Sequence, residues 1–102
     1  MLDLRPSCEQ CNTDLPPNAT KAMICSFECT FCFECATQVL QNVCPNCGGG
    51  FVARPVRPAR NLMGDNCLIK YPPTQKVTYK PVDIQAHAIF AEGIKTITPE
   101  HR

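Results

Sequence analysis

The chain has 102 residues, including nine cysteines, ten prolines and no tryptophan, and its formal net charge is +1. This length allows one small domain with a short extension. Charged residues make up 19% of the chain and the isoelectric point lies near 7.5, which excludes the strong basic field that drives non-specific binding to nucleic acid. No apolar run approaches the roughly 18 residues that span a membrane, so we expect no membrane association.

The N-terminal segment has no basic stretch followed by an apolar core, and it therefore does not resemble a secretory signal peptide. We expect a cytoplasmic protein. In a reducing compartment, closely spaced cysteines are typical of metal sites rather than of disulfides. A cysteine content of about 9% then predicts that metal, more than hydrophobic burial, stabilises the fold.

Eight of the nine cysteines form four close pairs in the first half of the chain. Two residues between ligands let both sulfurs reach one tetrahedral ion, and four thiolates complete a structural zinc site. Eight thiolates therefore predict two closed zinc sites. In chain order the pairs are Cys8 with Cys11, Cys25 with Cys29, Cys32 with Cys35, and Cys44 with Cys47.

Two other uses of the cysteines are less favoured. Cys29, Cys32 and Cys35 match part of a bacterial iron–sulfur motif, but eight residues rather than three separate Cys35 from Cys44. A disulfide framework would need an oxidising compartment. Cys67 remains unpaired, and neither a third site with His87 nor a reactive thiol has supporting neighbours in the sequence.

The segments between the pairs predict how the ions are shared. We expect Met23–Phe31 to form a short hairpin or tight loop, and apolar residues at helical spacing predict a short helix over Ala36–Val43. Such a helix separates Cys35 from Cys44 by roughly 13 Å, whereas sulfurs on one zinc ion lie about 4 Å apart. We therefore expect an interleaved pairing and keep a nested one, with the outermost pairs together, as the alternative. The interleaved scheme assigns Cys8, Cys11, Cys32 and Cys35 to site 1, and Cys25, Cys29, Cys44 and Cys47 to site 2.

We divide the chain into a two-zinc module over residues 1–54 and a proline- and arginine-rich linker with a C-terminal arm over residues 55–102. Arg54, Arg57 and Arg60 recur every third residue between prolines, so polyproline II geometry would place them on one basic strip. We interpret this strip either as a solvated linker or as a docking site for a polyanion or an acidic partner.

The arm is expected to be largely irregular. Asp83 as an N-cap and Gly93 as a C-terminal stop predict a short helix between them, although alternating apolar residues over 82–90 leave a strand open. Residues 77–79 are also β-prone. The apolar residues of the arm indicate docking on the zinc module, on a second copy to give a homodimer, or on a partner. These residues are Ile84, Ile89, Phe90, Ile94 and Ile97.

The order of the eight paired cysteines, with Pro45 in the last pair, resembles a cross-brace RING finger whose ligands are all cysteine. More closely, the runs 4–11, 24–32 and 44–51 resemble the bacterial domain of unknown function 1272 family, over about residues 1–58. Its members are small, cysteine-rich, zinc-type proteins without an established activity. The resemblance implies a small metal-stabilised α+β fold: a two-zinc, RING-like or treble-clef module with a short helix and a minimal β-hairpin.

The RING likeness is incomplete at the positions that recruit a ubiquitin-conjugating enzyme. RING-type ligases use an apolar residue in the first knuckle, an apolar or tryptophan contact near the helix and a basic residue after the last ligand. Here Glu9 and Gln10 occupy the first knuckle, tryptophan is absent, and Gly48 follows the last ligand. A ligase-like adaptor is therefore an alternative rather than our main interpretation.

We expect a noncatalytic zinc-binding protein that acts as a protein–protein interaction module. A catalytic zinc keeps an open coordination position, which four cysteines do not leave, and we predict no catalytic residue. One alternative is a nucleic-acid-associated zinc protein, because residues 51–102 carry eight basic and four acidic groups. A redox- or zinc-responsive sensor is another, because its folding would follow thiol and metal state.

Overall fold

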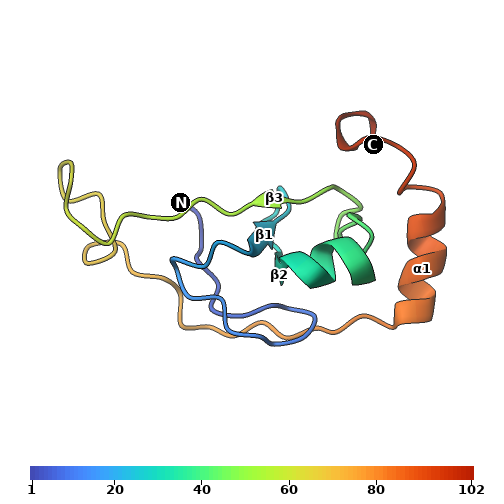
Figure 1. Cartoon of the computed structure of the whole chain (residues 1–102), viewed down its shortest axis with the longest axis horizontal. Coiled ribbons are helices and arrows are strands. Elements are labelled where there is room, and N and C mark those ends of the chain that lie inside the picture. The colour runs from blue at the N-terminus through green and yellow to red at the C-terminus, as the bar shows by residue number, and fades with distance from the viewer.

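The computed structural model describes all residues, 1–102. Its centre is a small antiparallel sheet of three strands in the order β2-β1-β3, next to a short π-helix (Figure 1). A long arm follows the sheet and ends in an α-helix and a 3₁₀ turn. The elements are β1 (Ala22–Ile24), β2 (Thr30–Cys32), η1 (Cys35–Val39), β3 (Val52–Ala53), α1 (Ile84–Glu92) and η2 (Pro99–His101).

The strands β1 and β2 form the hairpin expected over Met23–Phe31, with Met23 opposite Phe31. The backbone N–H of Cys25 donates to the Cys29 carbonyl at 3.2 Å and closes the turn, in which Glu28 has a φ of 66°. Strand β3 pairs with the other edge of β1, with Ile24 opposite Val52. The hairpin expectation is confirmed, and the third strand is an addition that the sequence did not predict.

The helix expected over Ala36–Val43 is shorter and of a different type. Its defining hydrogen bond runs from the N–H of Leu40 to the Cys35 carbonyl at 2.8 Å, five residues apart, which makes η1 a π-helix. Gln41 and Asn42 then have φ values of 54° and 59°, and these left-handed conformations end the helix. The Asn42 side chain accepts a hydrogen bond from the N–H of residue 51 at 2.9 Å, so the helix terminus is used to hold the chain that leads to β3.

The buried core is small and rich in thiols. Six of the twelve residues in the main buried cluster are cysteines. Phe31 and Phe51 meet edge to face in this cluster with their ring centroids 5.2 Å apart, a favourable aromatic geometry. The remaining members are Leu15, Ala22, Ala36 and Leu40. The same cysteines that could bind metal therefore also fill the interior.

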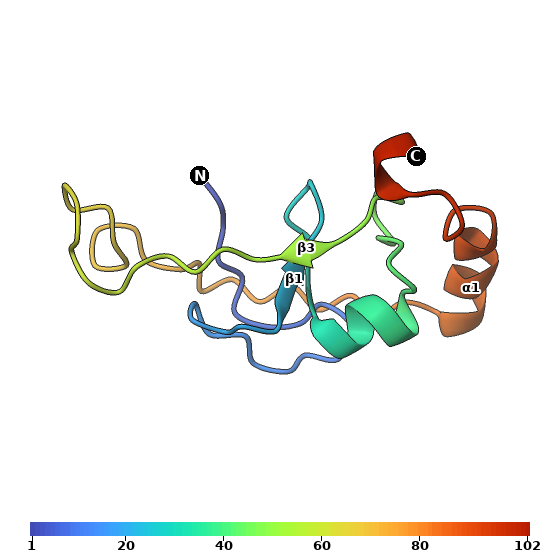
Figure 2. The same cartoon turned by 45° about the horizontal axis from the view of Figure 1, so that its top comes forward.

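The arm returns along the N-terminal segment and leads into α1, which is followed by η2 (Figures 1 and 2). Asp83 is the N-cap of α1, accepting a hydrogen bond from the N–H of Ala86 at 3.0 Å, and Gly93 is the C-cap. The helix prediction is thus confirmed, and the alternative of a strand over 82–90 is wrong because residues 84–92 are helical. The β-prone residues 77–79 form no strand.

The C-terminal end of the arm docks on the cysteine-rich part of the same chain. His87 is buried, and its Nε2 lies 2.9 Å from the carbonyl oxygen of Val43. The Arg102 guanidinium donates to the carbonyls of Asn42 at 2.7 Å and Gly48 at 3.1 Å. The arm thus contacts the cysteine-rich module, one of the three docking surfaces that we considered, and several apolar side chains of α1 remain exposed.

The expected strip of three exposed arginines does not form. Arg54 is only 4% exposed, and it donates to the backbone carbonyls of other segments. Arg57 donates to the carbonyls of Tyr71 and Leu2, which leaves Arg60 as the one exposed member. The regular spacing of the three arginines gives only their positions along the linker. It cannot show that other segments supply backbone carbonyls that accept hydrogen bonds from Arg54 and Arg57. No helix is long and apolar enough to cross a bilayer.

Candidate metal centre

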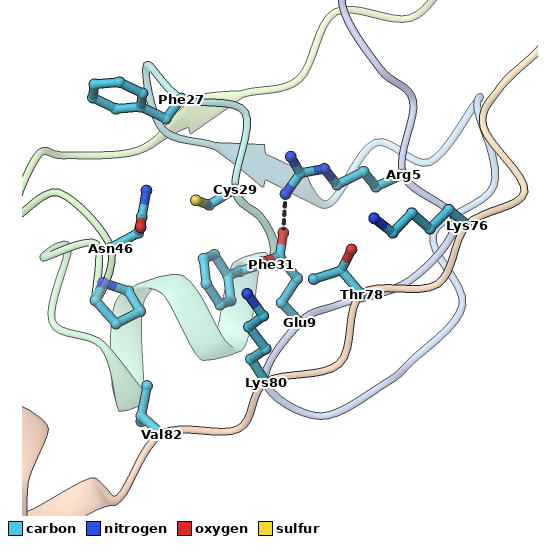
Figure 3. Close-up of a pocket in the computed structure, with 11 residues that line it drawn as sticks. Arg5, Glu9, Phe27, Cys29, Phe31, Asn46, Lys76, Thr78, Lys80 and Val82 are labelled. Carbon is cyan, nitrogen blue, oxygen red and sulfur yellow. Dashed lines mark hydrogen bonds and ion pairs between the residues drawn. The ribbon is translucent and has the colours of Figure 1, made fainter.

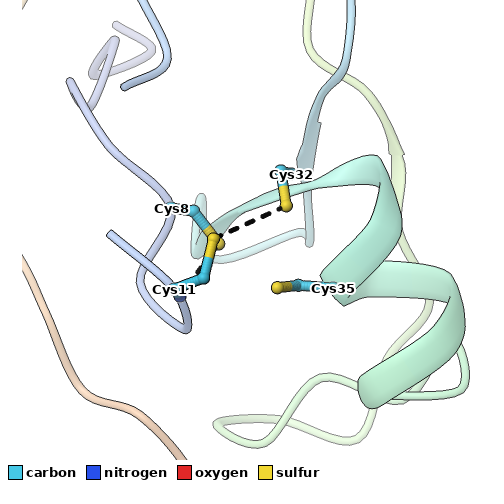
Figure 4. A group of neighbouring side chains, drawn as sticks. All are labelled: Cys8, Cys11, Cys32 and Cys35. Atoms are coloured by element: carbon cyan, nitrogen blue, oxygen red, sulfur yellow. Dashed lines mark hydrogen bonds between the residues drawn. The ribbon is translucent and has the colours of Figure 1, made fainter. Parts of the chain in front are cut away.

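The first cluster of thiols joins two distant parts of the chain. Cys8 and Cys11 lie in the N-terminal loop, Cys32 ends β2 and Cys35 begins η1 (Figure 4). All four Sγ atoms lie within 4.8 Å of one another, and those of Cys11 and Cys32 are 3.8 Å apart. A tetrahedral ion with metal–sulfur bonds of about 2.3 Å separates its sulfurs by roughly 3.8 Å, so the cluster fits one such ion.

Hydrogen bonds within the N-terminal loop fix the positions of Cys8 and Cys11. The N–H of Cys8 donates to Thr13 and that of Asn12 donates to Cys8, both at 2.9 Å. Asn12 has a φ of 63°, a conformation that asparagine tolerates better than most residues. The resulting turn aims the N–H of Cys11 at the Cys8 sulfur, 3.5 Å away, where it would stabilise a thiolate.

The second cluster contains Cys25, from the end of β1, with Cys44 and Cys47, whose Sγ atoms lie within 4.8 Å of one another. The loop of Cys44 is closed by the N–H of Gly48 donating to the Cys44 carbonyl and the N–H of Cys44 donating to Gly49, each at 2.8 Å. Gly48 has a φ of 77°, which favours glycine. Backbone N–H groups donate to all three sulfurs at 3.3–3.4 Å.

Cys29 lies beside this group of three rather than within it. Its side chain is buried and close enough to the thiols of Cys25 and Cys44 to affect its own ionisation, and its sulfur forms part of the wall of a cavity (Figure 3). The structure thus brings together three of the four cysteines assigned to site 2 and places the fourth next to them. The longer Cys25–Cys29 spacing is accommodated by the left-handed Glu28.

In the first cluster the thiols differ in how readily they ionise. Burial raises the pKa of Cys35 and of Cys32. Burial also acts to raise the pKa of Cys11, but hydrogen bonds with the Thr13 backbone and the Cys8 thiol outweigh it and lower this pKa to about 7. Because metals bind thiolates, an ion entering this cluster must displace protons from the thiols with raised pKa values.

The thiols of the second cluster also differ in how readily they ionise. Burial, followed by interaction with Cys25, raises the pKa of Cys29 to about 11, and burial also raises that of Cys44. For Cys25, burial is outweighed by hydrogen bonds with the backbone of Phe27 and Cys29, so its pKa is lowered. Here too, metal binding and proton release are coupled.

The remaining candidates are not brought into a site. All nine cysteines are free thiols, so no disulfide framework forms. Cys67 is buried in a turn in which its carbonyl accepts a hydrogen bond from the N–H of Tyr71 at 2.9 Å. His87 uses its Nε2 on the Val43 carbonyl rather than on a metal cluster. Neither residue belongs to a group of metal-ligating side chains.

The side chains that hold the second cysteine loop from outside were not predicted from the sequence. Asn42 binds residue 51, and Arg102 binds the carbonyls on both sides of the loop, at residues 42 and 48. Arg102 is 54 residues from Gly48 along the chain, and no local pattern reveals such a contact. The left-handed Asn42 does carry a weak signal, because asparagine often ends helices.

Comparison with known proteins gives a family but no activity. Residues 1–57 match the family described as protein of unknown function (DUF1272), and both thiol clusters lie within these residues. The chain is 54% identical over 81 residues to an uncharacterised protein of Rhizobium meliloti (strain 1021), covering 79% of this chain and 89% of that relative. No solved structure shows a significant match. The chain therefore belongs to the DUF1272 family, as its cysteine pattern predicted.

Proposed function

We propose that the protein binds two zinc ions, one in each thiol cluster, and acts noncatalytically as a protein–protein interaction module in the cytoplasm. The observation that carries the zinc proposal is the convergence of the sulfurs of Cys8, Cys11, Cys32 and Cys35 within 4.8 Å. An all-thiolate tetrahedral donor set is typical of structural zinc. The alternating use of cysteine pairs and the hairpin leading into η1 support a RING-like or treble-clef arrangement.

The noncatalytic part of the proposal follows from the donor set. Catalytic zinc sites keep a water position open and commonly include histidine or carboxylate ligands. The first cluster offers four thiols, and Cys29 lies beside the three thiols of the second. With four thiolates on each ion, neither site has a position for substrate.

Exposed apolar side chains support the interaction part. Ile84 and Ile89 of α1 are both exposed, as is Phe27 at the tip of the hairpin. Large apolar side chains that are exposed on the surface are available for contact with a protein partner. By contrast, the burial of Arg54 and the backbone contacts of Arg57 remove two of the three arginines from the basic strip that could have bound a polyanion.

One observation favours a second function, a redox- or zinc-responsive sensor. Each cluster contains one exposed cysteine, Cys11 in the first and Cys47 in the second. Oxidation of an accessible thiolate would remove a ligand and release the ion. Zinc release at micromolar peroxide, followed with a chromogenic zinc indicator, would support the sensor function. Retention of both ions would argue against the sensor and favour the interaction module.

Native mass spectrometry of the metal-loaded chain tests the zinc proposal. We expect two zinc ions per chain, and one ion in the Cys8→Ser and Cys32→Ser variants, which should lose the same ion. Cys47→Ser should lose the other, while Cys67→Ser is the control that keeps both. Iron in place of zinc, or Cys8 and Cys32 acting on different ions, would contradict the proposal.

Affinity capture with the zinc-loaded chain tests the interaction proposal. We expect a specific protein to be retained, and to be lost when Ile84 and Ile89 are both replaced by Asp. The matched control is the variant with Gln85 and Ala88 replaced by Asp, which adds the same two negative charges at exposed positions of the same helix and keeps both isoleucines. Equal retention by all three proteins would argue against a role for Ile84 and Ile89.

A further inference from the structure

A cavity of about 580 Å³ opens beside the second thiol cluster (Figure 3). This is within the roughly 300–1,000 Å³ of small-molecule sites. Four segments form its walls: the N-terminal segment, the turn of the hairpin, the second cysteine loop and the arm before α1. Among the residues that line this cavity, only Cys29 is a candidate metal ligand.

The arm contributes its charged side chains to this cavity in a regular way. The backbone of the arm is held by the N–H of Lys80 donating to the Glu9 carbonyl at 2.9 Å. Alternate side chains of an extended segment face opposite sides, and Lys76, Thr78 and Lys80 line the cavity. Val77, one of the residues between them, is 57% exposed.

This orientation is the reverse of what simple packing would favour. If the arm only covered the module, we would expect Val77 and Tyr79 to face the module and the lysines to face away from it. Instead Tyr79 is 53% exposed and the lysines border the cavity. Lys76 and Lys80 are themselves exposed. The arrangement keeps two ammonium groups at one opening, at the expense of apolar burial.

The cavity carries an excess of positive charge. Arg5 pairs with Glu9 at 2.9 Å, and the same carboxylate oxygen accepts a hydrogen bond from the N–H of Thr30 at 2.6 Å. Glu9 is buried, and both of these hydrogen bonds are accepted by its Oε2 atom. Lys76 and Lys80 form no ion pair with any carboxylate. Three cations against one carboxylate give these lining side chains an excess of two positive charges. The cavity also borders the second thiol cluster, which would carry a charge of about −2 if four thiolates held a zinc ion, so the two lysines are the groups available to attract an anion.

The opposite side of the cavity is apolar and partly aromatic. Phe27 is 65% exposed, and together with Phe31, Pro45 and Val82 it lines the cavity. Figure 3 shows the Phe27 ring on the hairpin side and the two lysines on the arm side. An aromatic face and a cationic face across one opening match a molecule with a planar apolar body and an anionic group.

We propose that this cavity binds a small organic anion. Its phosphate or carboxylate group is held by Lys76, Lys80 and Arg5, and its planar apolar body lies against Phe27 and Pro45. The site is separate from the metal ligands apart from Cys29, which forms part of the wall. Occupancy would therefore join the arm, the hairpin and the second cysteine loop.

Amide chemical shifts of the ¹⁵N-labelled, zinc-loaded full chain, titrated with phenyl phosphate, test this proposal. We expect saturable shifts at residues that line the cavity, with a Kd below about 1 mM. Benzoate as a second probe distinguishes a carboxylate site from a phosphate site. Inorganic phosphate and phenol each lack one half of the expected ligand, and both should bind at least about tenfold more weakly.

The double variant Lys76→Gln/Lys80→Gln should weaken phenyl phosphate binding at least about tenfold. Lys21→Gln/Lys70→Gln is the matched control, because it removes the same charge from exposed positions outside the cavity. Native mass spectrometry of the same samples reports zinc content, so that loss of the metal sites is distinguished from loss of the cavity.

Three outcomes would overturn the proposal. One is the absence of saturable shifts with either probe at about 10 mM. Another is an equal loss of binding in the control double variant, which would indicate attraction by overall charge alone. The third is weaker zinc retention in Lys76→Gln/Lys80→Gln without any probe binding to the original chain, because the lysines would then serve to balance thiolate charge.

Discussion

The Arg54 guanidinium links the sheet to the segment that carries the first two cysteines. It donates to the carbonyls of Arg5 at 2.9 Å, Leu15 at 3.3 Å and Pro16 at 2.9 Å. These acceptors lie on either side of the loop that holds Cys8 and Cys11. Burial lowers the pKa of the guanidinium, and the three carbonyls compensate for its removal from water.

We predict that Arg54→Leu destabilises the zinc-loaded protein by about 3 kcal/mol, because hydrogen bonds from a charged donor contribute about 1.5–3 kcal/mol and buried carbonyls would lose their partner. Urea unfolding followed by amide NMR measures this. Arg60→Leu is the matched control at an exposed position and should change stability by less than about 0.5 kcal/mol. Equal effects of the two substitutions would show that the Arg54 contacts are unimportant.

At the scale of elements, α1 and η2 hold the second cysteine loop in place from outside. Phe90 and Ile94 approach the position of Gly48, and Pro99 lies directly against Gly50. Together with the Arg102 contacts to the carbonyls of residues 42 and 48, this makes the C-terminal end of the arm a cover for the loop that contains Cys44 and Cys47. The close contact of Pro99 depends on the absence of a side chain at Gly50.

We predict that Gly50→Ala releases the C-terminal turn. A Cβ at this position would lie 2.7 Å from Cγ of Pro99, too close for van der Waals contact, so the turn must move. Hydrogen exchange of the amides over 94–102 should accelerate at least about tenfold. Gly93→Ala is the control, because its Cβ would meet nothing within 4 Å and Gly93 has a φ of −88°. Unchanged exchange in Gly50→Ala would refute the covering role.

At the scale of the whole molecule, the thiols hold the fold together, because half of the main buried cluster is cysteine. Deprotonated thiols packed this closely would repel one another without a cation between them. The raised pKa values of Cys29, Cys35 and Cys44 have the same cause in part. Metal binding and folding are therefore expected to be one process.

We predict that lowering the pH from about 8 to about 5 releases both ions and unfolds the chain. The metal-bound thiols have lower pKa values than the free ones, so the stability that they contribute is present at high pH and lost as the pH falls. At neutral pH each cluster should release at least two protons per ion bound, from Cys32 and Cys35 in the first and from Cys29 and Cys44 in the second. Amide NMR dispersion and metal release measure the transition.

A chelator at about pH 8 is the control, since it removes the metal without adding protons. It should produce the same collapse of NMR dispersion, and re-addition of zinc should restore the folded spectrum. A chain that keeps its dispersed spectrum after the metal is removed would show that the apolar contacts of Phe31, Phe51 and Leu40 suffice for the fold, contrary to this prediction.

Local chemistry determined what the sequence could predict by itself. Cysteine spacing indicated paired ligands and the family, because the geometry of a two-residue knuckle is encoded in the knuckle. Asp83 and Gly93 marked the bounds of α1, because capping depends on neighbours within one turn. The hairpin over Met23–Phe31 could likewise be predicted, because its two strands are close together in the sequence.

Contacts between distant segments could be found only in the folded chain. The burial of Arg54, the Arg102 contacts to the second cysteine loop and the lysines facing the cavity each depend on partners dozens of residues away. The early end of η1 also belongs here, because Asn42 is held in place by residue 51. The periodic pattern of a segment indicates on which side of that segment a residue lies. The groups that contact the residue come from other segments, and their positions are set only when the whole chain has folded.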